Sequence, residues 1–244
     1  MKKATFIILC LEGAILSFNV AACAALIPSI SKELAAPAFI TARIIWLYML
    51  PYGVAALFYG PLVRAFDAKK IELFCMVLFS LANLLAGLSV NIQVLFIARF
   101  FTGVFGASVI PLALILIARE INSLNRGRFV GLFFSATFIA SLLGLFLSGI
   151  IHWRMIFFIP AISGLIICIF IYFYLPSFKP EEISFRMNYS AAFKNKTIVP
   201  LFTYIFFISM FYHAIQQWLG VYFSWQYGFS QFLISMLITL TSLS

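Results

Sequence analysis

GPLVRAFDAKK, residues 60–70, lies between two apolar runs that are each about twenty residues long. Its ionisable groups fall within residues 64–70, in a chain that is 64 % hydrophobic and only 9 % charged. An apolar run of about twenty residues can cross the roughly 30 Å hydrocarbon core of a bilayer as a helix. Helices are predicted rather than strands, because backbone polar groups in lipid must be satisfied within the segment. The quoted stretch is therefore predicted to be a charged turn between two membrane-spanning helices.

Apolar runs recur along the whole chain and predict an all-α, polytopic membrane protein. Thirty of the 244 residues are Phe and seven are acidic, and the mean hydropathy is +1.11. A soluble domain typically has about a quarter of its residues charged. We predict an eighth, partial span from Gly228 to Ser244. Complete spans are predicted at residues 5–27, 43–63, 71–90, 93–118, 129–151, 155–175 and 197–220.

The basic residues predict the orientation of these spans. The loops on the side of the N-terminus contain Lys2, Lys3, Arg64, Lys69, Lys70, Arg119, Arg126, Arg128, Lys179, Arg186, Lys194 and Lys196. The opposite side has only Lys32, Arg43 and Arg154. Since basic residues concentrate in cytoplasmic loops, we expect a multi-pass protein of the cell (inner) membrane with its N-terminus in the cytoplasm. The net charge of +9 then serves orientation, and no nucleic-acid partner is expected.

The N-terminus and the cysteines have alternative interpretations. Residues 1–23 resemble a lipoprotein-type signal ending at Cys23, but Glu12 interrupts the apolar core and more spans follow, so we expect a retained helix. Cys10, Cys75 and Cys168 lie far apart within apolar spans and show neither metal nor disulfide spacing. The sequence has no nucleotide-binding glycine loop and no Ser-His-acid arrangement. We therefore expect neither an enzyme nor a metal or cofactor site.

The predicted layout is a six-helix bundle (residues 1–178), a cytoplasmic connecting loop (179–196) and the start of a second bundle (197–244). Transporters built from two six-helix halves have this layout. Residues 60–70 resemble the signature that follows the second span in the major facilitator superfamily, whose usual form is G-x-L-[A/S]-D-R-x-G-R-[K/R]. Gly60, Leu62 and Lys69 match it, whereas Arg64 replaces the usual Asp. In the family this loop locks the inward-closed arrangement through its carboxylate, and Asp67 is the candidate substitute.

Two further stretches carry the resemblance. Residues 99–103 are similar to the R-x-x-x-G pattern of the family's fourth span, and the fifth span is similar to the antiporter pattern G-x8-G-x3-G-P-x2-G-G with Leu145 in place of Pro. The positions that carry the antiporter pattern are Gly131, Ala140, Gly144, Ser148 and Gly149. The resemblance covers essentially the whole chain and implies a twelve-span drug:proton antiporter, of which this chain has the first bundle, one full helix of the second and part of another.

The fifth span has small residues at every fourth position: Ala140, Gly144 and Ser148. Such a stripe lets two helices approach closely and slide, because no large side chain intervenes. Ordinary tight packing explains the same pattern, so a hinge and a packing stripe are both open.

Charged groups inside the spans indicate where the chemistry lies. Glu12 is the only acidic residue that the segmentation places well inside a span, and a mid-helix charge usually faces an aqueous cavity. The resemblance places Asn19 where drug antiporters often carry an Asp, and an amide cannot take up a proton. Glu12 is therefore the expected proton-binding residue and Arg99 the complementary charge, although they lie toward opposite ends of their helices. The alternative is that Glu12 only orients the first helix at the interface.

Polar side chains at helical spacing predict a substrate cavity. The candidate lining residues are Asn19, Tyr52, Tyr59, Thr102, His213 and Gln216. Tyrosines near residue 48 also fit an interfacial aromatic belt, and a lone His213 also fits packing.

The expected function is proton-coupled export of small lipophilic or cationic compounds by alternating access, with the proton gradient as energy source. The expected partners are a small-molecule substrate, the lipid bilayer and further C-terminal helices of the same transporter. Residues 229–244 span about 24 Å as a helix, which is marginal for a bilayer. Two alternatives remain: uptake by a symporter of the same family, and a truncated fragment without transport activity.

Overall fold

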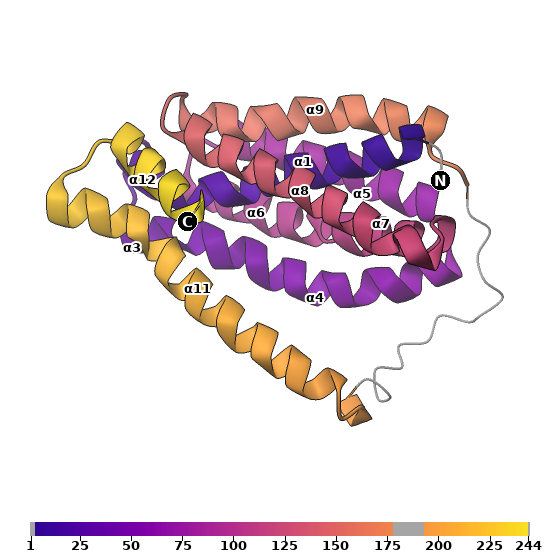
Figure 1. The fold of residues 1–244 in the computed structure, drawn as a ribbon. Coiled ribbons are helices and arrows are strands. Elements are labelled where there is room, and N and C mark those ends of the chain that lie inside the picture. Colours follow the sequence, from indigo (N-terminus) through magenta and orange to yellow (C-terminus); the bar gives the residue numbers. More distant parts are fainter. Residues whose placement is uncertain (1–2, 178–192, 244) are drawn as a thin grey trace.

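The computed structural model describes residues 3–177 and 193–243, which contain helices and no strand. Figure 1 shows these helices lying roughly side by side. They are α1 (Lys3–Ala25), α2 (Ile27–Glu33), α3 (Ala38–Thr41), α4 (Arg43–Ala65), α5 (Ala68–Gly87), α6 (Ile92–Gly106), α7 (Val109–Glu120), α8 (Ser123–Ser148), α9 (Trp153–Tyr174), α11 (Ile198–Tyr227) and α12 (Gln231–Leu243). The predicted all-α class is confirmed.

Seven helical segments are long and apolar enough to cross a membrane, and they agree closely with the predicted spans. The second span combines α3 with most of α4, and the fourth combines α6 with α7. The seventh continues to Tyr227, beyond its predicted end at residue 220, because the helix ends only at Gly228, which adopts a left-handed backbone with φ of 63°. Glycine at this position is a common helix stop. The eighth helix is short, with an apolar stretch of Gln231–Thr241.

Polar residues in the short loops begin the next helix. Asp67 accepts a hydrogen bond from the backbone N–H of Lys69 at 3.1 Å, and Asn91 accepts one from that of Val94 at 2.9 Å. A side-chain acceptor at a helix start satisfies an N–H group that has no partner within the helix. The charged turn of residues 64–70 therefore ends α4 and caps α5.

Helix α1 lies at the centre of the bundle. It packs along α8 and α9 and also contacts α7, α11 and α12, while α5 packs along α9 and α6, and α4 along α6. We call the end at which α1 and α5 begin the N-terminal end, and the end with α2 and α3 the opposite end (Figure 1). Because successive spans alternate in direction, the turns 64–70 and 119–128 share the N-terminal end.

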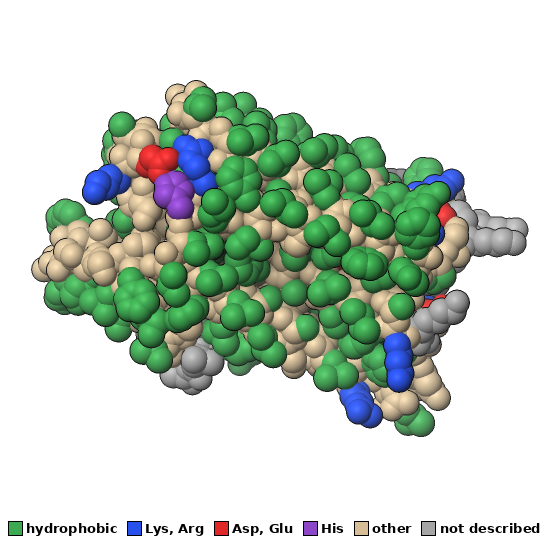
Figure 2. Space-filling model, turned by 90° about the horizontal axis from the view of Figure 1, so that it is seen from above, with side chains coloured by type: hydrophobic (Ala, Val, Ile, Leu, Met, Phe, Trp, Pro, Cys, Tyr) green, Lys and Arg blue, Asp and Glu red, His purple; other side chains and the backbone are tan. Residues whose placement is uncertain are grey.

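Helices α11 and α12 join the bundle at its opposite end. Helix α12 packs against α8, and α11 contacts α1, α2 and α12. Figure 1 shows α11 diverging from the bundle toward its own N-terminus. Large apolar side chains there are exposed, for example Phe202 at 66 % and Phe206 at 63 %. Figure 2 shows hydrophobic side chains over most of one face and charged side chains gathered at the two ends.

A polar clamp holds the opposite end of the bundle together. The Glu33 carboxylate of α2 accepts hydrogen bonds from Trp153 Nε1 at 2.6 Å and Arg154 Nε at 3.0 Å, and lies 2.9 Å from His152 Nε2. Arg154 Nη1 also donates to the carbonyls of Gly87 at 2.8 Å and residue 89 at 2.7 Å. Partial burial raises the pKa of Glu33, but these hydrogen bonds and nearby positive charges outweigh burial and hold the pKa below its ordinary value.

Candidate functional site

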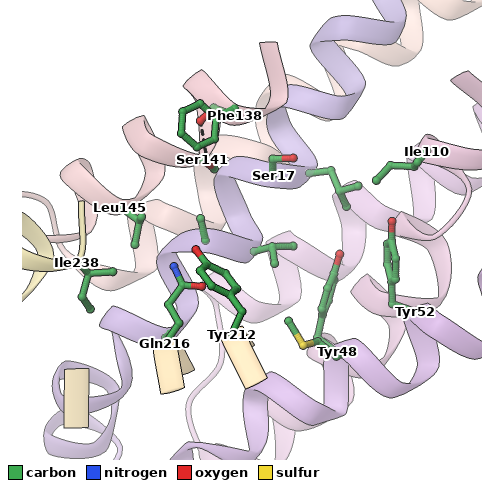
Figure 3. A pocket seen from close by; sticks show the side chains of 15 residues that line it. Ser17, Tyr48, Tyr52, Ile110, Phe138, Ser141, Leu145, Tyr212, Gln216 and Ile238 are labelled. Atoms are coloured by element: carbon green, nitrogen blue, oxygen red, sulfur yellow. Dashed lines mark hydrogen bonds between the residues drawn. The ribbon is translucent and has the colours of Figure 1, made fainter. Parts of the chain in front are cut away.

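A cavity of about 530 Å³ lies between the first bundle and the helices that follow it. Its polar lining residues are Ser17 of α1, Tyr48 and Tyr52 of α4, Ser141 of α8, and Tyr212 and Gln216 of α11. Figure 3 shows Tyr48 and Tyr52 side by side, with Tyr212 and Gln216 reaching the same space from α11. This volume is within the range of pockets that hold drug-sized molecules, about 300–1,000 Å³.

The chemistry of the cavity wall is aromatic and uncharged. Among the side chains that the structure describes, none that lines it belongs to Asp, Glu, Lys, Arg or His, and the remaining lining residues are apolar. The rings of Tyr48 and Tyr52 stack with their centres 5.5 Å apart. The Tyr48 hydroxyl is buried and has no hydrogen-bond partner among the side chains that the structure describes. A buried hydroxyl without a partner is costly, so a ligand acceptor in the cavity would relieve this cost.

Of the predicted lining residues, Tyr52 and Gln216 line this cavity. Asn19, Tyr59 and Thr102 are not in the wall of this cavity and hydrogen-bond elsewhere within the bundle, so their role as lining residues stays a prediction. The Tyr59 hydroxyl donates to the Val104 carbonyl at 3.0 Å, and the Thr102 hydroxyl donates to the Ala98 carbonyl at 2.7 Å. The side chain of His213 lies outside the described residues. Helical spacing identified a polar face but not which part of it reaches the cavity.

Arg99 and Asn19 form a buried polar cluster beside the cavity. The Arg99 side chain is 1 % exposed, and its Nη1 donates to Asn19 Oδ1 at 2.7 Å. Its Nε donates to the Ile44 carbonyl at 3.2 Å, and its guanidinium lies 4.4 Å from the centre of the Tyr48 ring. Asn19 Nδ2 in turn donates to Asn83 Oδ1 at 3.0 Å. The cluster joins α1, α4, α5 and α6.

Glu12 lies apart from this cluster and does not meet Arg99. It is fully buried, and within the described part of the chain neither of its carboxyl oxygens has a hydrogen-bond partner. The same is true of Glu72 on α5, and the two carboxyl groups interact electrostatically. Sequence reasoning missed Glu72 because it follows directly after the charged turn, where a glutamate is expected to face water. Glu12 is therefore not the only acidic residue inside the bundle.

The signature loop contacts the end of α9. Asp67 accepts a hydrogen bond from the Ser177 hydroxyl as well as capping α5, and Lys69 Nζ lies 5.6 Å from the centre of the Tyr172 ring. Leu62 packs against the cluster around Tyr59, and Gly60 has open space at its Cβ position. These contacts hold the loop to the first bundle.

The small-residue stripe of α8 lies where three helices meet. A Cβ on Gly144 would be 2.3 Å from the Phe18 carbonyl oxygen of α1. The hydroxyls of Ser148 and Ser235 of α12 lie 2.9 Å apart, and a Cβ on Gly149 would be 2.8 Å from Ser235 Cβ. Ala140 is also buried, whereas a Cβ on Gly131 would meet nothing within 4 Å.

Several cavity residues were not predicted. Ser17 and Ser141 are isolated small polar residues in apolar helices, and Tyr212 lies among many other aromatic residues of α11. Helical spacing did not signal them, since Ser17 lies two positions from the predicted Asn19 and Ser141 one position from Ala140, and such neighbours do not share a helix face. The sequence offered no measure of which apolar helix face meets a second bundle rather than lipid.

Comparison with known proteins finds one family model and several transporters that are similar to this chain. A family model described as Major Facilitator Superfamily matches residues 9–244. Azole resistance protein 1 of Saccharomyces cerevisiae is 29 % identical over 139 residues, which cover 54 % of this chain and 23 % of that protein. The MFS-type transporter phomT of Diaporthe leptostromiformis is 28 % identical over 236 residues, which cover 93 % of this chain and 39 % of that protein. The chain therefore spans well under half the length of these two relatives.

Solved structures share the fold. The human organic anion transporter MFSD10 matches with a TM-score of 0.73 at 14 % identity, covering 98 % of this chain and 69 % of that chain. The inward-open xylose transporter XylE from E. coli matches with a TM-score of 0.66 at 14 % identity, covering 98 % and 66 %. At these identities the likeness concerns the fold alone.

Proposed function

Because this chain belongs to the major facilitator superfamily, we propose that it is part of a proton-driven secondary transporter that exports small lipophilic molecules. The observation that carries this proposal is the uncharged aromatic cavity, which is lined by helices of the first bundle and by α11 and α12. The family and the fold point to transport rather than catalysis. Export is favoured because relatives at 28–29 % identity include an azole resistance protein and an efflux pump.

The helices around the cavity support alternating access. At the opposite end, Ser148 of α8 contacts Ser235 of α12, and Gln231 Nε2 donates to the Ala25 carbonyl at 2.7 Å. Toward the N-terminal end, α11 diverges from the bundle (Figure 1). We assign this arrangement to a state that is closed at the opposite end and open toward the N-terminal end. With the N-terminus in the cytoplasm, as the basic residues predict, this state faces inward in the inner membrane.

The cavity wall favours apolar substrates with few polar groups. A polyhydroxylated ligand such as a sugar needs a hydrogen-bond partner for each buried hydroxyl, and the wall offers six polar side chains among fifteen. Tyr48, Tyr52 and Tyr212 present aromatic rings and hydroxyls, which suit an aromatic ligand with one or two acceptors. Their ring faces also suit a lipophilic cation.

Proton coupling is assigned to Glu12. Its carboxyl group is buried, without a hydrogen-bond partner, one helical turn before Leu16, which lines the cavity. Arg99 is the complementary charge, but its hydrogen bonds to Asn19 and Ile44 are already made, so its proposed role is to position helices. Glu12→Gln should therefore abolish gradient-driven export and leave membrane insertion intact.

The direction of transport is tested in proteoliposomes with an imposed pH gradient. A neutral azole and tetraphenylphosphonium serve as probes, and a protonophore is the control for coupling. For transporter molecules inserted inside-out, the vesicle interior corresponds to the outside of the cell. If that interior is acidic, accumulation of the probe inside supports export in exchange for protons, whereas loss of the probe together with protons indicates symport. Absence of any gradient-driven flux of either probe refutes the proposal for these substrates.

A pair of tryptophan variants tests whether the cavity is the transport site. Ser17 lines the cavity, while Leu143 on α8 is 53 % exposed on the outer face of the bundle. Ser17→Trp should fill the cavity and block flux, and Leu143→Trp should leave flux unchanged. Equal flux in both variants would show that the substrate passes elsewhere.

Further helices of the same transporter are proposed to cover α11. No residue in the most apolar stretch of α11 is buried in the described structure. Large side chains such as Phe202, Phe206 and Phe211 are exposed there. A helix that is apolar all round is usually buried among other helices or surrounded by lipid. Crosslinking from the variant Phe206→Cys would distinguish the two, because a protein neighbour gives a crosslinked protein product and lipid does not.

A further inference from the structure

Two buried glutamates lie inside the first bundle and interact electrostatically with each other. Glu12 of α1 and Glu72 of α5 are both 0 % exposed, and all four of their carboxyl oxygens lack a hydrogen-bond partner among the described residues. They interact electrostatically without bonding to each other. Burying two unpaired charges together is far costlier than burying one, because neither has a countercharge or a hydrogen-bond donor. The pair must therefore hold at least one proton.

The surroundings of the pair are weakly polar. Other titratable groups that interact with it are Cys168 on α9, Cys75 on α5 and Tyr59 on α4. The Ser108 hydroxyl at the start of α7 lies beside Glu72, but donates its hydrogen to the Phe105 carbonyl at 3.0 Å. No lysine, arginine or histidine of the described chain contributes to the electrostatics of either carboxyl group. Among the described residues, therefore, no countercharge is available to the pair.

The two carboxyl groups lie at different depths. Glu72 is one helical turn from the start of α5 at Ala68, near the N-terminal end. Glu12 is more than two turns into α1 and one turn before Leu16 of the cavity wall. Along the direction from the N-terminal end to the cavity, Glu72 therefore comes first and Glu12 second.

We propose that Glu72 is a second proton-binding residue, and that Glu12 and Glu72 pass a single proton between the N-terminal end of the bundle and the cavity. Glu72 exchanges the proton with water at the N-terminal end, and Glu12 exchanges it with water in the cavity. No other bond is made or broken. This inference rests on the proposed proton coupling, to which it adds a residue and a path.

Glutamine variants separate a proton role from a structural one. Glutamine keeps the volume of glutamate but cannot take up or release a proton at these positions. Glu12→Gln and Glu72→Gln should each lose gradient-driven accumulation while keeping substrate exchange in the absence of a gradient. Glu120→Gln, which changes an exposed carboxylate at the end of α7, is the matched control and should keep both. Undiminished accumulation in Glu72→Gln, or loss of exchange together with accumulation, would overturn the proposal.

Infrared spectroscopy tests the pair independently of transport. A protonated carboxylic acid has a carbonyl band that is absent from carboxylates and from glutamine, and exposed carboxyl groups are ionised at neutral pH. The wild-type protein should show a band of the same intensity as each single variant, and Glu12→Gln/Glu72→Gln should show none. A wild-type band twice that of the single variants, or no wild-type band, would overturn the single-proton pair. If wild-type protein shows no gradient-driven flux, the proposed function fails, but the infrared measurement still shows whether Glu12 and Glu72 hold one proton between them.

Discussion

Helix α8 offers a direct test of how closely it packs on α1. Gly144→Ala adds one methyl group whose carbon would lie 2.3 Å from the Phe18 carbonyl oxygen and 3.0 Å from the carbonyl carbon. A carbon and an oxygen in ordinary contact are about 3.3 Å or more apart. The two helices would have to separate locally by about 1 Å, since the obstacle is backbone rather than a flexible side chain.

The cost follows from two opposing effects. Overpacking in a close-packed region costs about 1–3 kcal/mol, while replacing glycine by alanine within a helix contributes about 0.5–1 kcal/mol in the other direction. From the middle of both ranges we expect a net loss of about 1 kcal/mol in the free energy of unfolding. For a chain of this size that corresponds to a fall of about 2–4 °C in Tm.

Thermal unfolding can be followed with a thiol-reactive fluorophore, because Cys23, Cys75 and Cys168 are buried in the folded protein. Gly131→Ala is the matched control on the same helix, since its Cβ would meet nothing within 4 Å. That variant should keep the gain in helix propensity and raise Tm slightly. A Gly144→Ala protein that unfolds at or above the wild-type temperature would refute the close approach of α8 to α1.

Three further variants test the polar contacts. Arg99→Lys should lower Tm, because an ammonium group cannot reproduce the two-sided guanidinium contacts with Asn19 and the α4 backbone. Each hydrogen bond to a charged group contributes about 1.5–3 kcal/mol, so an unchanged Tm would contradict a stabilising role of the buried polar cluster. Glu33→Gln should lower Tm at neutral pH but not in acid. The pKa of Glu33 is below its ordinary value of 4.5 in the folded protein. Its contribution to stability is therefore present above pH 4.5 and is lost as the pH falls through the lower folded-state pKa. A difference in Tm between the variant and the wild type that persists in strong acid would contradict this. Tyr52→Phe should weaken binding of a ligand with a hydrogen-bond acceptor by about 2- to 12-fold and leave Tm unchanged, because one hydrogen bond contributes about 0.5–1.5 kcal/mol. Equal affinity of variant and wild type in a binding titration would place that hydroxyl outside the site.

The sequence by itself determined the architecture. Apolar length and composition located every span to within a few residues, apart from the longer α11, because a membrane helix depends on the local sum of residue hydropathies. The motifs at residues 60–70, 99–103 and 131–149 identified the superfamily, which the family match over residues 9–244 confirms. The expected boundaries of the two bundles remain a prediction.

The site depended on features that a linear pattern does not contain. Tyr48, Tyr52 and Tyr59 share a helix face, yet Tyr59 bonds to α6 while the other two line the cavity. Glu72 looked like part of a solvent-facing turn and is fully buried. Burial and distance depend on how each helix is rotated and shifted against its neighbours, and those degrees of freedom are fixed by packing between spans that are far apart in the sequence. Hydropathy adds up along the chain, whereas an electrostatic interaction between two buried carboxyl groups on separate helices exists only once the bundle has formed.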